Sequence, residues 1–219
     1  MFSQSEENYL KAIYSLEIDL KDSINTNLIA EMMETKASSV TDMIKKLDSK
    51  NLVIYEKYKG VNLTSEGRKV ALSIIRKHRL WETFLVEKLN YSWDEVHDIA
   101  EQLEHIQSKD LVNRLDEFLE FPTSDPHGDP IPDKDGKIVY KQKSLLSNFE
   151  HNKTCIVVGV KDSSTSFLKF LEKVQINLGS TITILSMEDY DNSYTIEILG
   201  KEINISNQIA KNIFIKPEN

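Results

Sequence analysis

Apolar residues recur at the spacing of amphipathic helices through the first fifty residues of the chain. In the first such segment they fall at Tyr9, Leu10, Ile13, Leu16 and Leu20. This spacing is typical of a helix that buries one face. Ser3, followed three residues later by Glu6, predicts a capping box at its start.

Two shorter helices are expected to follow in close succession. The first covers LIAEMM and is capped by Asn25 or Thr26, and the second covers ASSVTDMIKKLDSKN. The second helix is expected to bury Val40, Leu47 and either Ile44 or Met43. Its other face carries hydroxyls and lysines, so the pair has the pattern of a helix-turn-helix.

The next segment, LVIYEKYKGVNLT, alternates as two short strands around a turn at Lys59 and Gly60. Thr64 is placed to cap the helix that begins after it. Three helices followed by a hairpin predict a winged helix-turn-helix, in which Lys57, Tyr58 and Lys59 of the wing can touch DNA phosphates. Such domains also dock proteins, but residues 26–80 carry 11 basic and 6 acidic side chains, and this charge of +5 favours DNA.

The whole chain has a different charge balance. It has 219 residues, enough for more than one domain, and a net charge of −8. Residues 81–219 hold 14 basic and 24 acidic side chains, so this part is suited to binding cations. We expect a cytoplasmic protein with no membrane partner, because no apolar run is long enough to span a bilayer and the first residues have no signal-peptide pattern. The single cysteine, Cys155, excludes an intrachain disulfide and is expected to be a buried strand residue.

Histidines and carboxylates gather in HRLWE and VHDIAEQLEH. If the second segment is one helix, its metal-ligand types project from a single stripe. They are His97, Glu101, Glu104 and His105. His78 and Glu82 repeat the spacing on the preceding helix, so the two helices could form a divalent-metal site. The other interpretation, that each pair is a solvated contact one helical turn apart, stays open at this point.

The last part of the chain changes character. Residues 122–136, PTSDPHGDPIPDKDG, hold four of the five prolines and form a stiff connector. Beyond it, TCIVVGV, STITILSM, SYTIEIL and INIS read as short strands, interrupted by a helix over SFLKFLEKVQI. This predicts a small β-barrel.

These segments together resemble the diphtheria-toxin-repressor family, and specifically its three-domain, manganese-responsive branch. The likeness lies in HRLWE, VHDIAEQLEH, the FPTSDPHGDPIP connector and the terminal barrel. It implies a mainly α fold with a small β part. The implied domains are a winged helix-turn-helix at 1–64, a helical metal-binding and dimerisation domain at 65–121, a Pro-rich connector at 122–150, and an SH3-like barrel resembling the ferrous-transport accessory (FeoA) fold at 151–219.

The resemblance also implies two metal sites in a repressor that takes Mn²⁺, or alternatively Fe²⁺, as its co-repressor. The primary site would use Glu101, Glu104, His105 and Asn8, a position that is Asp in manganese-type and Met in iron-type relatives. The second site would use His78, Glu82, His97, Asp125, His127 and Asp162. The regulated genes would include metal-uptake transporters.

A homodimer of such a protein would bind double-stranded DNA at a dyad-symmetric operator. We expect base contacts from Lys36, Ser38 and Asp42. Phosphate contacts are expected from Thr26, Ser39, Thr41, Lys46 and Lys59. The chain has no nucleophile–base arrangement and no phosphate-binding glycine loop, so we do not expect an enzyme.

Two alternatives remain. One is a winged-helix regulator that senses another effector and does not respond to metal. The other is a carboxylate-bridged metal enzyme in a helical bundle, which would require Glu-x-x-His on two helices. Glu101 and His105 are four residues apart, which disfavours that class.

Overall fold

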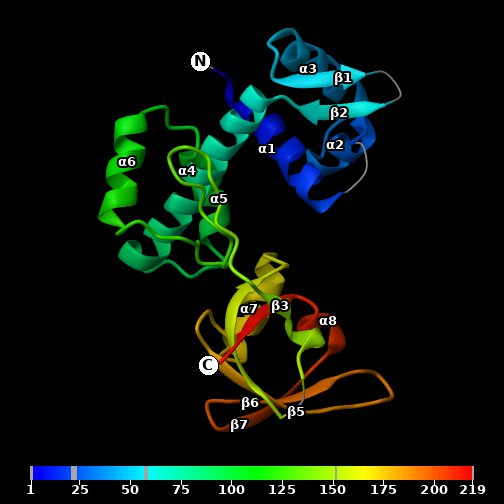
Figure 1. The fold of residues 1–219 in the computed structure, drawn as a ribbon, viewed down its shortest axis with the longest axis vertical. Coiled ribbons are helices and arrows are strands. Elements are labelled where there is room, and N and C mark those ends of the chain that lie inside the picture. Colours follow the sequence, from blue (N-terminus) through cyan, green and yellow to red (C-terminus); the bar gives the residue numbers. More distant parts are fainter. Residues whose placement is uncertain (1, 21–23, 57–58, 151, 219) are drawn as a thin grey trace. The chain divides into compact units, whose positions relative to one another are not determined.

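We describe the protein from a computed structural model, which places residues 2–20, 24–56, 59–150 and 152–218 (Figure 1). Lys57 and Tyr58, expected in the wing, lie outside these described residues. The helices are α1 (Gln4–Asp19), α2 (Thr26–Met32), α3 (Ala37–Ser49), α4 (Ser65–Leu89), α5 (Val96–Leu103), α6 (Lys109–Phe118), the 3-10 turn η1 (Leu146–Asn148), α7 (Thr165–Lys173) and α8 (Asn207–Ala210). The strands are β1 (Val53–Glu56), β2 (Gly60–Leu63), β3 (Ser144–Leu145), β4 (Thr154–Val160), β5 (Thr181–Met187), β6 (Tyr194–Ile198), β7 (Lys201–Ile205) and β8 (Ile213–Pro217). The prediction of a mainly helical fold with a small sheet is confirmed.

The chain packs as two compact units. The first contains residues 1–78, 101–113 and 132–137, and the second contains residues 79–100, 114–131 and 138–219. Each unit is described by itself below. Within the described ranges, every helix is too short or too polar to cross a bilayer.

The helix starts of the first unit follow the sequence pattern. Ser3 and Glu6 form both halves of the expected capping box on α1, and the Asn25 side chain accepts hydrogen bonds from two backbone N–H groups of α2. Thr64 accepts from the Gly67 N–H at 3.0 Å and so caps α4. Local sequence therefore decides where these helices begin.

The core of the winged helix-turn-helix forms on the faces that the periodicity predicts. In α3, Val40, Ile44 and Leu47 are buried. β1 and β2 pair as an antiparallel hairpin, and Ile24 adds an isolated bridge to Val61 (Figure 1). The first unit thus presents the remaining face of α3 to solvent.

Glu6 ties α1 to α3. Its side chain is 2% exposed, and Oε1 accepts from Lys50 Nζ at 2.5 Å and lies 3.1 Å from Lys46 Nζ. Burial alone would raise the pKa of Glu6, but the hydrogen bonds from Lys50, the Ser3 backbone and Lys46 outweigh it and lower the pKa to about 2. The Glu6 carboxylate therefore stays charged between the two helices.

α5 is shorter than the sequence predicts. It ends at Leu103, where the N–H of Ile106 donates to the Leu103 carbonyl at 3.1 Å and closes a turn. Glu104 and His105 lie in this turn, so the expectation of one helical stripe through His105 is wrong.

The second unit contains a six-stranded antiparallel sheet in the order β3-β8-β4-β5-β6-β7. β8 lies between β3 and β4, although the sequence pattern did not indicate it. Register shifts at Val157/Gly159 and Ile184/Ser186 mark bulges, which increase the bend of a sheet. Cys155 is buried on β4 as expected, and burial raises the pKa of its thiol to about 12.

The connector rests on β4. The N–H of Val160 donates to the His127 carbonyl at 2.9 Å. Gly128 has φ +83°, and a Cβ there would lie 2.1 Å from the Val158 carbonyl oxygen. This close approach fixes the position of Asp125 and His127.

We predict that Glu6→Gln lowers the free energy of unfolding by about 1–2 kcal/mol at neutral pH, a value reduced by solvent screening of the partly exposed lysines. Because the pKa of Glu6 is lower in the folded protein than its ordinary value of 4.5, its contribution is complete above that value and is lost as the pH falls toward about 2. Urea unfolding of parent and variant between pH 7 and pH 2 measures this. Glu66→Gln, in the first turn of α4, is the exposed control, and a Glu6→Gln difference that persists unchanged at the lowest pH would contradict the assignment.

We predict that Gly128→Ala destabilises the protein by at least about 2 kcal/mol more than Gly179→Ala does. Both glycines have φ near +80°, but a Cβ at Gly179 meets no atom within 4 Å. Comparing the two variants therefore separates the effect of the clash with β4 from the effect of backbone strain. Thermal unfolding measures the difference. Equal losses of stability in the two variants would show that the close approach of Gly128 to β4 does not contribute to stability.

Candidate metal centre

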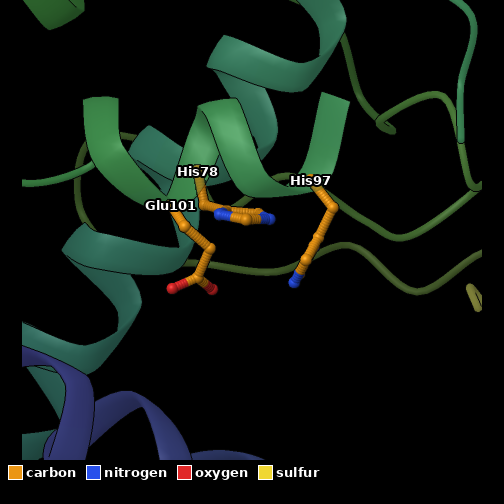
Figure 2. Close-up of side chains that lie close together, drawn as sticks. All are labelled: His78, His97 and Glu101. Carbon is orange, nitrogen blue, oxygen red and sulfur yellow. The ribbon is translucent and has the colours of Figure 1, made fainter. Parts of the chain in front are cut away.

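Charged and imidazole side chains gather between α1, α4 and the end of α5 in the first unit. We call this group the first cluster; contacts join Glu7, Lys11, His78, Glu101, Glu104 and His105, and we include Asn8 because it lies between Glu7 and Lys11 on α1. Three of them come from one side of α1, since positions 7, 8 and 11 share a helical stripe. Figure 2 shows His78 of α4 beside Glu101 of α5.

Lys11 and His78 compensate the carboxylates of α5 and the turn after it. Lys11 Nζ donates to Glu101 Oε1 at 2.5 Å and to Glu104 Oε2 at 2.7 Å. His78 Nδ1 lies 2.6 Å from Glu104 Oε2. Glu104 is fully buried, so these two cationic or polar partners offset the cost of removing its charge from water.

His105 is held from the other side by α1. Its Nδ1 lies 2.6 Å from Glu7 Oε2, and Gln107 donates to Glu7 Oε1 at 2.9 Å. An ionised carboxylate can only accept, so Nδ1 carries the proton and Nε2 keeps its lone pair when the ring is neutral. Lys77 lies nearby, and burial lowers the pKa of its ammonium although Glu7 and Glu104 act in the opposite direction.

Two buried oxygens of the first cluster are suited to a metal ion. Asn8 Oδ1 and Glu104 Oε1 accept no hydrogen bond from the part of the chain that the structure describes. Buried polar atoms nearly always have a partner. His105 Nε2 lies 3.9 Å from Glu104 Oε1, so a carboxylate oxygen and an imidazole nitrogen lie together there, and Asn8 is adjacent on α1 to Glu7, which contacts His105. This donor set fits Mn²⁺ or Fe²⁺.

A second cluster lies in the second unit and contains Glu82, Asp125 and His127. All three are buried, and one ligand atom from each lies within 4.8 Å of the others. His127 Nε2 donates to the Trp93 carbonyl at 2.9 Å, which leaves Nδ1 facing Glu82 Oε2 at 3.6 Å. The imidazole is therefore oriented with Nδ1 toward the carboxylates.

Burial and neighbouring charges shift the pKa values of the second cluster. Burial raises the pKa of Asp125 to about 7, and the adjacent Glu82 and Asp129 act in the same direction. Burial lowers the pKa of His127, but Glu82 and Asp125 outweigh it and raise the pKa to about 9. Arg79 Nε lies 3.4 Å from Asp125 Oδ2 and offsets part of its charge.

The remaining expected ligands lie as follows. His97 is exposed on α5, one turn before Glu101, and its Nδ1 lies 3.5 Å from Glu82 Oε1. Asp162 accepts a hydrogen bond from the Ser164 N–H at 2.8 Å and is not a member of the second cluster within the described residues. His78, implied for the second site, contacts Glu104 of the first cluster, and its role in a second site stays a prediction.

The expected DNA-contacting residues lie on the surface of the first unit. Lys36, Ser38, Ser39, Asp42, Lys46 and Lys59 are exposed, and Thr26 and Thr41 are half-buried. The Thr41 hydroxyl donates to the Ala37 carbonyl, and Lys59 pairs with Glu56. Their contacts with DNA stay a prediction.

The sequence alone did not indicate Glu7 or Arg79, and it did not place Lys11 between Glu101 and Glu104. The sequence of α1 did contain a signal for these residues, because Glu7, Asn8 and Lys11 form a polar stripe beside the apolar face of that helix. For Arg79 no local pattern existed, since its partners come from the connector.

Comparisons with known proteins match successive parts of the chain. The N-terminal DNA binding domain of iron dependent repressors matches residues 1–61, their metal binding and dimerisation domain matches residues 64–133, and the FeoA domain matches residues 145–217. The iron-dependent repressor IdeR of Mycobacterium leprae is 36% identical over 126 residues, which are 58% of this chain and 54% of that relative. The match thus spans about half the length of IdeR.

Two further relatives align over almost the whole chain. The diphtheria toxin repressor of Corynebacterium diphtheriae is 27% identical over 96% of both chains. A solved structure of a manganese-dependent transcriptional repressor in complex with manganese is 34% identical, covers 97% of this chain and 100% of its own, and superposes with a TM-score of 0.84. On the sequence, the fold and these matches, the chain belongs to the diphtheria-toxin-repressor family of metal-dependent transcriptional repressors.

Proposed function

We propose that the protein is a metal-activated repressor that binds a dyad-symmetric operator as a homodimer, with Mn²⁺ as its co-repressor and Fe²⁺ as the alternative. The observation that carries the proposal is the first cluster, in which α1 of the winged helix-turn-helix meets Glu104 and His105. The orphaned oxygens of Asn8 and Glu104 come from these two different parts of the first unit. Metal ligation there would therefore stabilise one arrangement of them.

The donor types support Mn²⁺. Glu101 and Glu104 supply carboxylates, Asn8 an amide oxygen and His105 an imidazole, and such oxygen-rich sites suit harder divalent ions. A bound ion would supply positive charge to Asn8 Oδ1 and Glu104 Oε1 at once. Ligand binding can shift an equilibrium only by its differential affinity for the two states, which for coupled sites is typically about 1–3 kcal/mol.

The residues of α1 would couple metal binding to the DNA-binding face. Asn8 would hold the ion and Glu7 contacts the His105 ring. Glu6 contacts Lys46 of α3 and Lys50 directly after it. Three consecutive residues would thus link the proposed metal-binding and DNA-binding parts of the unit. We propose base contacts from Lys36, Ser38 and Asp42 and phosphate contacts from the hydroxyls and lysines around them.

Glu82, Asp125 and His127 are proposed as a second metal site. His97 is near enough to Glu82 to join it after a rotation of its exposed side chain, whereas Asp162 would need to leave its hydrogen bond to Ser164. Buried carboxylates with a protonated imidazole between them are what such a site holds before a metal binds. The regulated genes would be metal-uptake genes, and a DNA-binding protein of this kind would act in the cytoplasm.

We expect Mn²⁺ to tighten binding of the metal-stripped protein to its own upstream promoter DNA by about tenfold or more. Fluorescence anisotropy at fixed ionic strength measures this, with Fe²⁺ titrated anaerobically and Zn²⁺ for comparison. EDTA should reverse the effect. DNA binding that is equally tight with and without metal would instead favour a winged-helix regulator that does not sense metal.

We expect Glu104→Gln to remove most of the metal-dependent gain in DNA affinity, about tenfold, because it takes away an orphaned carboxylate oxygen and its charge. Glu87→Gln, on the exposed side of α4, is the matched control. Circular dichroism checks that both variants fold. If Glu104→Gln still responded to Mn²⁺ as the parent does, the first cluster would not be the regulatory site.

A further inference from the structure

The first cluster already contains a cation fixed to the chain. Lys11 Nζ contacts Glu101 Oε1 and Glu104 Oε2 and lies 3.4 Å from His78 Nδ1. Two carboxylate oxygens and an imidazole nitrogen are ligand types that a divalent ion takes. The side chain is only 20% exposed, so water screens this ammonium weakly.

The atoms that Lys11 contacts differ from the atoms left open. Lys11 takes Oε2 of Glu104, whereas Oε1 of the same carboxylate and Oδ1 of Asn8 have no hydrogen bond within the described residues. His105 Nε2 faces Oε1. The Glu104 carboxylate therefore has one oxygen committed to the ammonium and one available to an ion.

We propose that Lys11 is a resident cation that holds the first cluster together before metal binds and sets the affinity of the site. It joins α1 to Glu101 and Glu104 without a metal, so the ligands are assembled in advance. It also places a positive charge on the far side of the Glu104 carboxylate, which lowers the attraction of that group for a divalent ion. The inference rests on the proposed function of the same site.

This role of Lys11 would raise the metal concentration at which the site is occupied. A site whose carboxylates are already compensated responds only when the ion is abundant, whereas the same ligands without Lys11 would bind at lower concentrations. The metal-free protein would then lose stability, because Glu104 would be buried with less compensation. Affinity and metal-free stability should therefore move in opposite directions on removal of the ammonium.

The test measures Mn²⁺ binding to the metal-stripped full-length protein by calorimetry, without DNA. Lys11→Met, which keeps the length of the side chain, should bind Mn²⁺ at the first cluster about tenfold more tightly and unfold at a lower temperature in the metal-free state. Lys11→Arg keeps the charge and should stay within about threefold of the parent affinity. Lys45→Met, on the exposed face of α3, is the control for loss of a surface lysine.

A double variant tests whether the effect of Lys11 acts through the Glu104 carboxylate. In a protein that already carries Glu104→Gln, Lys11→Met should change the Mn²⁺ affinity very little. A folded Lys11→Met protein with the parent's affinity would overturn the proposal, and so would Lys11→Arg binding as tightly as Lys11→Met. If Lys11→Met does not fold without metal, Lys11→Gln takes its place under the same criteria. A parent protein that binds no Mn²⁺ would instead refute the proposed function.

Discussion

The structure depends on the compensation of one fully buried carboxylate, that of Glu104. An ionised carboxylate without partners in a protein interior is costly, by several kcal/mol even after relaxation. Its partners come from α1 and α4, so satisfying it requires those helices and the turn after α5 to meet. The same requirement leaves Oε1 of Glu104 open beside His105. A constraint of folding thus creates the candidate metal site.

α1 is the element through which this constraint reaches the DNA-binding face. Glu6 and Glu7 are adjacent in sequence and therefore point in different directions from the helix, one toward α3 and the other toward His105. Both glutamates are buried, and both contacts are close. A change in the first cluster cannot move α1 without affecting the lysines of α3. This continuity, and not the position of any single ligand, makes a metal-sensing repressor the function that fits the chain.

Much of the fold could be predicted because local signals coincide with it. The Ser3–Glu6 capping box, the apolar stripe of α3 and the β1–β2 hairpin are each encoded within a few residues. The end of α5 was not predictable, because VHDIAEQLEH continues a helical pattern, whereas the turn after Leu103 brings Glu104 and His105 to partners on α1 and α4 that are distant in sequence. β8 was missed for a similar reason, because its apolar run is short and becomes a strand by pairing with β3 and β4, which are distant in sequence. The ligand types could be read from sequence, whereas the contact of His78 with the first cluster depends on packing.

The two clusters neutralise their carboxylates in different ways. In the first, the Lys11 ammonium contacts Glu101 and Glu104, so the compensating charge belongs to the chain. In the second, the raised pKa values of Asp125 and His127 mean that protons supply much of it, with Arg79 beside them. A divalent ion entering the second cluster would therefore displace protons, and one entering the first would bind beside the Lys11 ammonium. The two clusters therefore differ in the source of the compensating charge, which is a lysine of the chain in the first and, in the second, bound protons together with Arg79.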